Sequence, residues 1–437
     1  MFALTNVMRD YPWGSSTAIA QLLGTTPGGG PEAELWIGAH PDSPSTAATA
    51  DGPVPLDELI AAHPGSTLGG GVHAAFGAKL PFLMKLLAAD QALSLQVHPT
   101  LAQARERFAA EEAAGIPRDA AHRNYKDQNH KPEMIFALTP FEALCGFRPS
   151  AESAALFRAV AAAITATGAQ PPSLLGRVEM TLNSRIEEST AIRQVFEALM
   201  DGGDQTAALV GLAAQALGGA LEHSPEAGVA GLAGIAGGGP LPGNAEAALR
   251  TMVDLARDHP KDPGVLLSLL LNRVSLQPGE SIYLPAGNIH AYLSGLGLEV
   301  MASSDNVLRG GLTGKHVDVP ELLATVNFSP GSVPQVPTRV TDLGQHVWEP
   351  PFAEFALQRV EITAASGPVP LVQNGPLLVL VVQGSVLLDT PRNDMALSRG
   401  GSAFIPAMES PVLVHPHIDE NEQAPGSAVL FAVTVAG

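Results

Sequence analysis

Two side chains that can bind a metal ion lie two positions apart in residues 93–99, Leu-Ser-Leu-Gln-Val-His-Pro. If this stretch is a β-strand, Gln96 and His98 point to one face and the apolar side chains to the other, because side chains alternate along a strand. Pro99 would end the strand, since proline cannot donate to the next ladder bond. A carboxamide oxygen and an imidazole nitrogen side by side make half of a metal site. Alone the pair is weak evidence, because most histidines in strands are simply hydrogen-bonded.

A polar stretch over residues 122–131 runs directly into another apolar segment that is expected to be a strand. His130, Lys131 and Glu133 stand at the mouth of that strand, where a rigid scaffold would present the residues of a site. Glu133 would supply the anionic ligand that the first pair lacks. Polar loops of this kind are more often simply solvated.

One lysine, Lys85, interrupts the apolar run of residues 80–87. A lysine on a core strand is costly unless its ammonium group reaches solvent, a partner or an anionic ligand. Contact with a substrate and snorkelling to the surface both stay open. Nearer the start, Trp13 sits in a turn where core packing is the commoner role, and His40 precedes a proline in a loop without a partner nearby.

Residues 277–293 contain a second group of interest. Gly279 and Pro285 bracket an expected strand, a glycine turns the chain, and His290 opens the next strand. The spacing of Gly, five residues, Pro, one residue, Gly, two residues and His resembles the second motif of the cupins. Cupins are small double-stranded β-helix barrels that hold a metal in the barrel mouth. The match is incomplete, because Ser294 occupies the position where an Asn is usual.

Composition narrows the class of protein. The 437 residues carry a formal charge of −19, which argues against nucleic acid or an anionic membrane as a partner. An anionic substrate would therefore need lysines and arginines gathered locally. Cys145 is the only cysteine, which excludes an intramolecular disulfide and indicates a reducing compartment. We see no signal-peptide pattern and no uninterrupted apolar run of about 18 residues, so we expect a cytoplasmic protein.

The expected fold class is mainly β, with two cupin-type jelly-roll domains and an inserted α-helical domain. Residues 1–149 and 261–329 would form a discontinuous catalytic cupin domain, within which residues 1–60 are expected to be short strands and loops. The Ala-rich residues 150–260 would form the insert, with a flexible low-complexity excursion over residues 224–244. Expected helices cover residues 101–114, 151–165, 189–200 and 245–257.

Residues 330–437 are expected to form a second, cupin-like domain without a metal. Gly400 and Pro406 repeat the spacing seen at Gly279 and Pro285, but the following Gly and His are missing. We therefore expect one metal ion per chain.

Together these segments resemble the type I mannose-6-phosphate isomerases, a cupin family. The resemblance is carried most specifically by the polar residues 124–133 and by residues 305–313, and it extends over residues 11–14, 33–45, 80–98, 124–149 and 283–328. It implies one Zn²⁺ per chain, bound by Gln96, His98, Glu133 and His290. It also implies active-site roles for Arg309, Glu299, Lys131, Asp305 and His130, and substrate contacts for Lys85, Ser94 and Trp13.

The resemblance further implies the interconversion of mannose 6-phosphate and fructose 6-phosphate through an enediol(ate), with a proton moved between C2 and C1. Glu299 is our expected base, because it stands alone between two apolar neighbours on an expected strand. A metal-dependent cupin oxygenase and a sugar-binding cupin without activity are the alternatives. The expected partner is a small sugar phosphate, with no nucleic acid and no membrane, and the chain is expected to be a monomer. The pathway, mannose use or supply of GDP-mannose, stays open.

Overall fold

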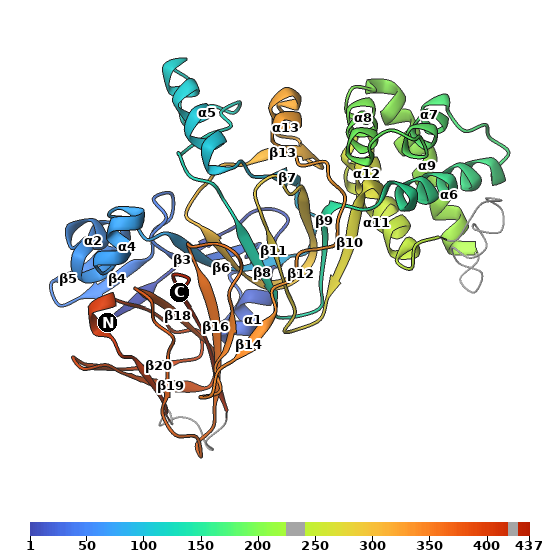
Figure 1. Cartoon of the computed structure of the whole chain (residues 1–437). Coiled ribbons are helices and arrows are strands. Elements are labelled where there is room, and N and C mark those ends of the chain that lie inside the picture. The colour runs from blue at the N-terminus through green and yellow to red at the C-terminus, as the bar shows by residue number, and fades with distance from the viewer. Residues whose placement is uncertain (224–240, 418–426) are drawn as a thin grey trace.

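The computed structural model describes residues 1–223, 241–417 and 427–437. In these residues the chain is mainly antiparallel sheet, with a group of helices to one side (Figure 1). The expected mainly β fold with inserted helices is confirmed in this coarse form. Most of the expected flexible excursion over residues 224–244 lies outside the described residues, and the division of the chain into three domains stays our proposal.

One ten-stranded sheet carries the residues with metal-binding chemistry. Its strands are β2 (Val7–Arg9), β3 (Glu34–Gly38), β6 (Phe82–Ala89), β7 (Leu95–Val97), β8 (Glu133–Ala137), β9 (Phe141–Phe147), β10 (Leu271–Leu276), β11 (Ser281–Leu284), β12 (His290–Ala302) and β13 (Leu308–Gly311). The long strand β12 is the hub, because it pairs antiparallel with β6, β7, β8 and β9. Strands from residues 82–97 and 133–147 therefore meet beside it.

The two faces of this sheet pack into different cores. Along β6, Met84 and Leu86 belong to a core shared with the C-terminal strands, whereas Leu87 lies in a separate core on the opposite face. All eight residues of β6 are buried, which explains why its sequence is apolar rather than alternating. Lys85 lies on the same face as Leu87, so its charge is held inside the protein.

The C-terminal strands form a four-stranded sheet of their own and, with three strands from the start of the chain, a nine-stranded sheet. The larger contains β1 (Phe2–Thr5), β4 (Thr46–Thr49), β5 (Gly52–Pro55), β14 (Thr338–Val340), β15 (His346–Trp348), β16 (Ala356–Ile362), β18 (Leu377–Gln383), β21 (Ser402–Ile405) and β23 (Ala428–Thr434). The smaller contains β17 (Val369–Pro370), β19 (Ser385–Asp389), β20 (Asp394–Ser398) and β22 (Leu413–Pro416). Phe2 on β1 pairs with Phe404 on β21, so strands from both ends of the sequence share one sheet.

The expected helices of the insert are present as α6, α8 and α11, and the helix expected over residues 101–114 is α5. The helices of the chain are α1 (Ala18–Leu23), α2 (Leu56–Ala62), α3 (Pro64–Thr67), α4 (Gly70–Phe76), α5 (Leu101–Ala113), α6 (Ser150–Ala166), α7 (Ser173–Leu182), α8 (Glu188–Met200), α9 (Gly203–His223), α11 (Ala245–Asp258), α12 (Gly264–Leu267) and α13 (Val319–Thr325). Thr100 and Gln103 form a capping box at the start of α5. Within the described residues, no helix has both the length and the apolar character needed to cross a membrane.

The expectation that residues 1–60 contain only strands and loops is wrong. Helix α1 and helix α2 lie in this region. Each has only six or seven residues, too few to repeat the helical pattern of apolar positions. In α2, Leu56 and Ile60 are buried, so packing of one apolar stripe holds the helix.

We predict that Phe431→Ala will lower the free energy of unfolding by about 3–5 kcal/mol. The Phe431 ring lies 5.2 Å from that of Phe136, which in turn lies 4.8 Å from Trp348, so these rings join the two large sheets. Denaturant unfolding measures the change. Leu343→Ala is the control, because Leu343 is 60% exposed and should change the same free energy by less than about 0.5 kcal/mol. Equal losses in the two variants would contradict a core shared by the sheets.

Candidate metal centre and active site

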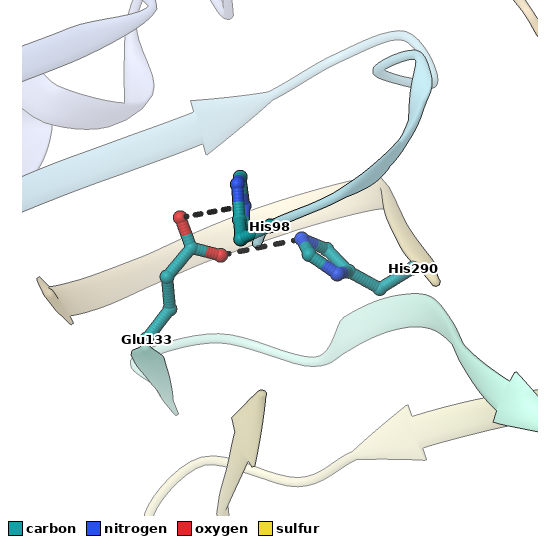
Figure 2. Close-up of side chains that lie close together, drawn as sticks. All are labelled: His98, Glu133 and His290. Carbon is teal, nitrogen blue, oxygen red and sulfur yellow. Dashed lines mark ion pairs between the residues drawn. The ribbon is translucent and has the colours of Figure 1, made fainter. Parts of the chain in front are cut away.

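Three side chains from three strand ends meet inside the ten-stranded sheet (Figure 2). His98 directly follows β7, Glu133 begins β8 and His290 begins β12. His98 Nε2 lies 3.3 Å from Glu133 Oε1, and His290 Nε2 lies 3.2 Å from Glu133 Oε2. Each residue is at most 1% exposed, so the three polar groups face one another away from water.

Strand pairing brings Gln96 to the same place. Gln96 on β7 stands opposite His290 on β12 and opposite Arg309 on β13. Residues directly opposite each other in a sheet project to the same face. Gln96 is partly buried there, whereas its neighbours Leu95 and Val97 are fully buried on the other face. The expected alternation of β7 is therefore present, although the strand is shorter than expected.

Each histidine of the cluster is oriented by a backbone carbonyl. His98 Nδ1 lies 2.7 Å from the carbonyl oxygen of Asn306, and His290 Nδ1 lies 3.0 Å from that of Asn288. A carbonyl only accepts, so each imidazole donates its proton through Nδ1 and turns a lone pair on Nε2 toward the centre. Second partners of this kind fix the tautomer of histidines that bind metals.

Charges around Glu133 keep its carboxylate ionised. Burial opposes ionisation, but Lys131 Nζ, 2.8 Å from Oε1, and the two imidazoles hold the pKa of Glu133 well below its usual range. Burial lowers the pKa of His98 to about 4, against the opposing pull of Glu133. The centre therefore combines a carboxylate with a neutral imidazole at neutral pH.

The cluster fits a divalent metal. Within the described residues, the Nε2 atoms of His98 and His290 and Oε2 of Glu133 are buried without a hydrogen-bond partner. Unpaired buried polar atoms are rare in native proteins, and three facing one point indicate a ligand. Two imidazole nitrogens, a carboxylate and the Gln96 amide suit zinc or a similar ion. Among the described His, Cys, Asp and Glu residues, no other group of three is placed to hold a metal.

A second buried polar group lies on the same face of the sheet. Glu299 on β12 is paired with Lys85 on β6, and Lys85 is paired with Trp36 on β3. Lys85 Nζ lies 3.1 Å from Glu299 Oε2, 3.9 Å from Glu34 Oε2 and 4.7 Å from the centre of the Trp36 ring. Trp36 Nε1 also donates to Glu34 at 2.7 Å. Glu34 was not among the expected site residues, although its place two positions before Trp36 puts both side chains on one face of a strand.

Burial sets the protonation of these groups in opposite directions. Burial raises the pKa of Glu299, and Lys85 opposes that rise. The pKa of Lys85 is raised, because Glu34 and Glu299 outweigh its desolvation. Lys85 is therefore a permanent cation, whereas Glu299 can take up a proton more readily than an exposed carboxylate.

Asn306 ties two loops together beside His98. Its side chain accepts from the backbone N–H of Lys126 at 2.7 Å and donates to the carbonyl oxygens of Asp127 and Asn129, each at 2.8 Å. The Asp127 carboxylate accepts in return from Ser304 Oγ at 2.9 Å. The carbonyl that orients His98 thus belongs to a fully buried residue held on several sides. Sequence analysis did not assign a role to Asn306.

Three cations lie near one another at the edge of this region. Arg309 is partly buried, burial lowers its pKa, and no hydrogen bond or ion pair engages its side chain in the described part of the chain. Lys315 is exposed overall, but partial burial of its ammonium group lowers its pKa, and the positive charges of Arg309 and Lys126 lower it further. Lys126 forms an ion pair with Asp305. Burial alone would raise the pKa of Asp305, but the contact with Lys126 outweighs burial, so the pKa is lowered. Sequence analysis did not single out Lys315 or Lys126.

The other expected site residues lie around these groups. Trp13 is partly buried against the core that contains Leu87, and its ring stacks on that of Tyr11 with 5.7 Å between the ring centres. Ser94 is partly buried just before β7. His130 turns its Nε2 to Glu354 Oε1, 2.5 Å away, rather than to the three-residue centre.

We predict that His290→Ala will lose zinc and activity together. The variant removes an imidazole whose lone pair faces the centre, and the remaining groups make a poor metal site. Elemental analysis of the purified protein measures the metal. His73→Ala is the control, since His73 lies exposed on α4 and should leave one zinc per chain. Full zinc content and normal turnover in His290→Ala would contradict the assignment.

Comparison with known proteins gives a consistent result. Residues 1–150 match the family described as phosphomannose isomerase type I, catalytic domain. The chain is 38% identical to mannose-6-phosphate isomerase of Salmonella typhimurium over 94% of its own length and 96% of that protein, and 31% identical to the human enzyme over 94% of each.

Solved structures agree over the whole chain. The structure of mannose 6-phosphate isomerase from Salmonella typhimurium bound to substrate and zinc has a TM-score of 0.81 and 35% identity, and the match covers 100% of both chains. A further structure of a mannose 6-phosphate isomerase holds zinc and yttrium, with the same TM-score and 34% identity. On this similarity of sequence and fold, the chain belongs to the type I mannose-6-phosphate isomerase family.

Proposed function

We propose that this chain interconverts mannose 6-phosphate and fructose 6-phosphate in a zinc-dependent aldose–ketose isomerisation. The observation that carries the proposal is the His98–Glu133–His290 centre with the buried Lys85–Glu299 pair on the same sheet face. The first group supplies metal ligands, and the second supplies a carboxylate of raised pKa. The family relationship supports the same substrates.

Gln96, His98, Glu133 and His290 would hold the zinc ion. When bound, zinc polarises the substrate carbonyl and stabilises negative charge on its oxygen. Lys131, whose ammonium lies 2.8 Å from Glu133, would place a second positive charge next to that oxygen. All of these side chains except Gln96 are buried, so their charges act in a region from which water is largely excluded.

Glu299 is our proposed base. It would accept the proton from C2 of the aldose and return it to C1. Burial raises its pKa toward the working pH, which increases the driving force for taking a proton from carbon. Lys85 at 3.1 Å keeps enough ionised carboxylate for the reaction. Asp305 is a weaker candidate because its carboxylate is paired with Lys126 and its pKa is lowered; Lys131 stays an alternative.

The phosphate would be held by the cation group at the edge of the site. Among the described residues, partly buried Arg309 makes no side-chain hydrogen bond or ion pair, and the charge of Asp305 only partly offsets its desolvation, so an anionic ligand would compensate the rest. Lys315 and Lys126 reinforce its positive charge. Ser94 and Trp13 lie at positions that would line the sugar pocket. His130 would help to position its neighbour Lys131 and would not contact the substrate.

Neither alternative function is supported by these contacts. A cupin oxygenase usually has more histidine ligands, and a protein that only binds sugar has no use for a buried base of raised pKa. We also propose a cytoplasmic monomer with a metal-free C-terminal domain. In that domain His415 lies 3.3 Å from Asp389, outside any group that could hold a metal in the described residues.

The test is a coupled assay of fructose 6-phosphate formed from mannose 6-phosphate, with and without a chelator. We expect turnover that the chelator abolishes and that added zinc restores. An oxygen electrode run on the same samples would reveal an oxygenase. Sugar phosphate binding without turnover in zinc-loaded protein would contradict the proposal.

We predict that Arg309→Lys will lower kcat/KM by about 10- to 100-fold with zinc retained, corresponding to one or two charge-assisted hydrogen bonds. Lysine keeps the charge but loses the planar fork that matches a phosphate. Steady-state kinetics and zinc analysis measure the two effects. Arg105→Lys, on the exposed side of α5, should behave as the parent. Parental kinetics in Arg309→Lys would place this residue outside the site.

We predict that Glu299→Gln will bind zinc normally and fail to exchange the C2 hydrogen of mannose 6-phosphate with solvent. Glutamine keeps the shape of the side chain and removes its basicity. Proton NMR of the substrate in deuterated water follows the exchange. Continued exchange at the parental rate would make Lys131 or Asp305 the base.

A pH profile gives a further prediction for the same pair. The base must be ionised, so kcat/KM should fall as the pH decreases through the pKa of Glu299. Lys85→Met removes the cation at 3.1 Å, which raises that pKa further and should move the acid limb to higher pH by about 1 unit or more. Lys79→Met, an exposed neighbour, should leave the limb in place. An unmoved acid limb in Lys85→Met would exclude Glu299 as the group responsible.

A further inference from the structure

We propose that Glu354, in the segment between β15 and β16, is a positioning residue of the active site that acts through His130. The kinetic part of this inference rests on the proposed isomerase function. It assigns the C-terminal part of the chain an indirect role in the active site, through a residue that positions another side chain.

The contact itself is close and partly buried. His130 Nε2 lies 2.5 Å from Glu354 Oε1, and the two side chains are 25% and 14% exposed. Burial alone would raise the pKa of Glu354, but the hydrogen bond and charge of His130 outweigh it and lower the pKa. A hydrogen bond to an ionised carboxylate is stronger than one between neutral groups, so this contact can fix the imidazole in one orientation.

His130 lies between two residues that are already fixed to the site. On one side, the carbonyl oxygen of Asn129 accepts from Asn306 Nδ2 at 2.8 Å. On the other side, Lys131 Nζ lies 2.8 Å from Glu133 Oε1. The loop is thus tied to the loop of Asn306 before His130 and ends at the metal centre after it. Glu354 is the partner that holds it from the C-terminal side.

Glu354 is itself rigidly placed. Its neighbour Phe355 is fully buried in the core shared by the two large sheets. Phe352 packs edge-on against Tyr283 at 5.6 Å, and Tyr283 on β11 is paired with Met134 on β8. The segment that carries Glu354 is therefore anchored to the same strand that begins at Glu133. An anchor of this kind can hold a neighbouring loop to within a fraction of an ångström.

Removing the Glu354 carboxylate should therefore loosen residues 124–132 and misplace the Lys131 ammonium, while the metal ligands stay on their strands. The loss would fall on kcat more than on zinc content or on the overall fold. A contact that only fastened the two sheets together would instead lower the melting temperature without a selective effect on turnover.

The experiment compares Glu354→Ala with Glu349→Ala in the full chain loaded with zinc. Glu349 is a matched control, since it is also an acidic residue of the C-terminal region, and its ion pair is with Arg339, at 3.1 Å, instead of with a residue of the loop. We expect Glu354→Ala to lower kcat by about 10-fold or more, because a small misplacement of a catalytic group can cost up to about 100-fold, with zinc content and KM near the parent. Glu354→Gln keeps a hydrogen-bond acceptor and loses the charge, so its kcat should lie between those of the parent and Glu354→Ala. It replaces the alanine variant if that variant does not fold.

Two readouts separate positioning from a merely structural role. Hydrogen exchange should increase in residues 124–132 in Glu354→Ala and not in Glu349→Ala. In a His130→Gln background, adding Glu354→Ala should change kcat by less than about 2-fold, because residues that act through each other are not additive.

Parental exchange in residues 124–132 would overturn the inference, and so would a full loss of kcat from Glu354→Ala in the His130→Gln background. If the parent protein shows no isomerase activity, the proposed function fails, and the exchange comparison still decides whether Glu354 positions the loop.

Discussion

The buried carboxylate of Glu133 is the constraint on which the rest of the structure depends. Two imidazole lone pairs and a carboxylate face one another at distances near 3 Å with almost no exposure to water. Such an arrangement is stable only when a cation neutralises it, which a bound metal ion does and Lys131 does in part. The strand register of β12 is what brings these groups together, because this strand begins with His290 and pairs with β8, which begins at Glu133, and with β7, which ends directly before His98. Displacement of β12 by one residue would turn His290 and Glu299 to the opposite face together.

The interior of the sheet carries several buried charges. Lys85 and Lys131 face the carboxylates of Glu34, Glu133 and Glu299, which leaves one negative charge in excess. A divalent metal reverses that sign and makes the interior attractive to an anionic sugar phosphate, in a protein whose overall charge is −19. Burying these groups costs stability, and the apolar face on the other side of the same strands offsets the cost. The site therefore depends on the C-terminal sheet even where that sheet contributes no ligand.

Sequence reasoning found the groups whose chemistry is visible locally and missed those whose partners are distant. Alternation placed Gln96 and His98 on one face and set Glu299 apart from its two apolar neighbours. The mainly β fold was expected from the resemblance of the Gly279–Pro285–His290 spacing to a cupin motif, and the helices from composition. Glu34, Asn306 and Glu354 acquire their importance only from neighbours that are distant in the sequence or on another sheet, such as Glu354 beside His130. Short helices such as α2 depend on one or two buried side chains and carry too few residues for a periodic signal.

The pairing of β1 with β21 also determines when the protein can become complete during synthesis. The edge of β1 that pairs with β21 has no partner until Phe404 has left the ribosome. The other edge of β1 pairs with β4, so β1 links β4 to β21 in the sheet. Until then the emerging chain exposes an unpaired strand edge, a surface that recruits other chains. Contacts so distant in sequence also slow folding, because a very long loop must close before they form. Ribosome-bound intermediates that end before β21 should thus be the species that most need chaperone protection.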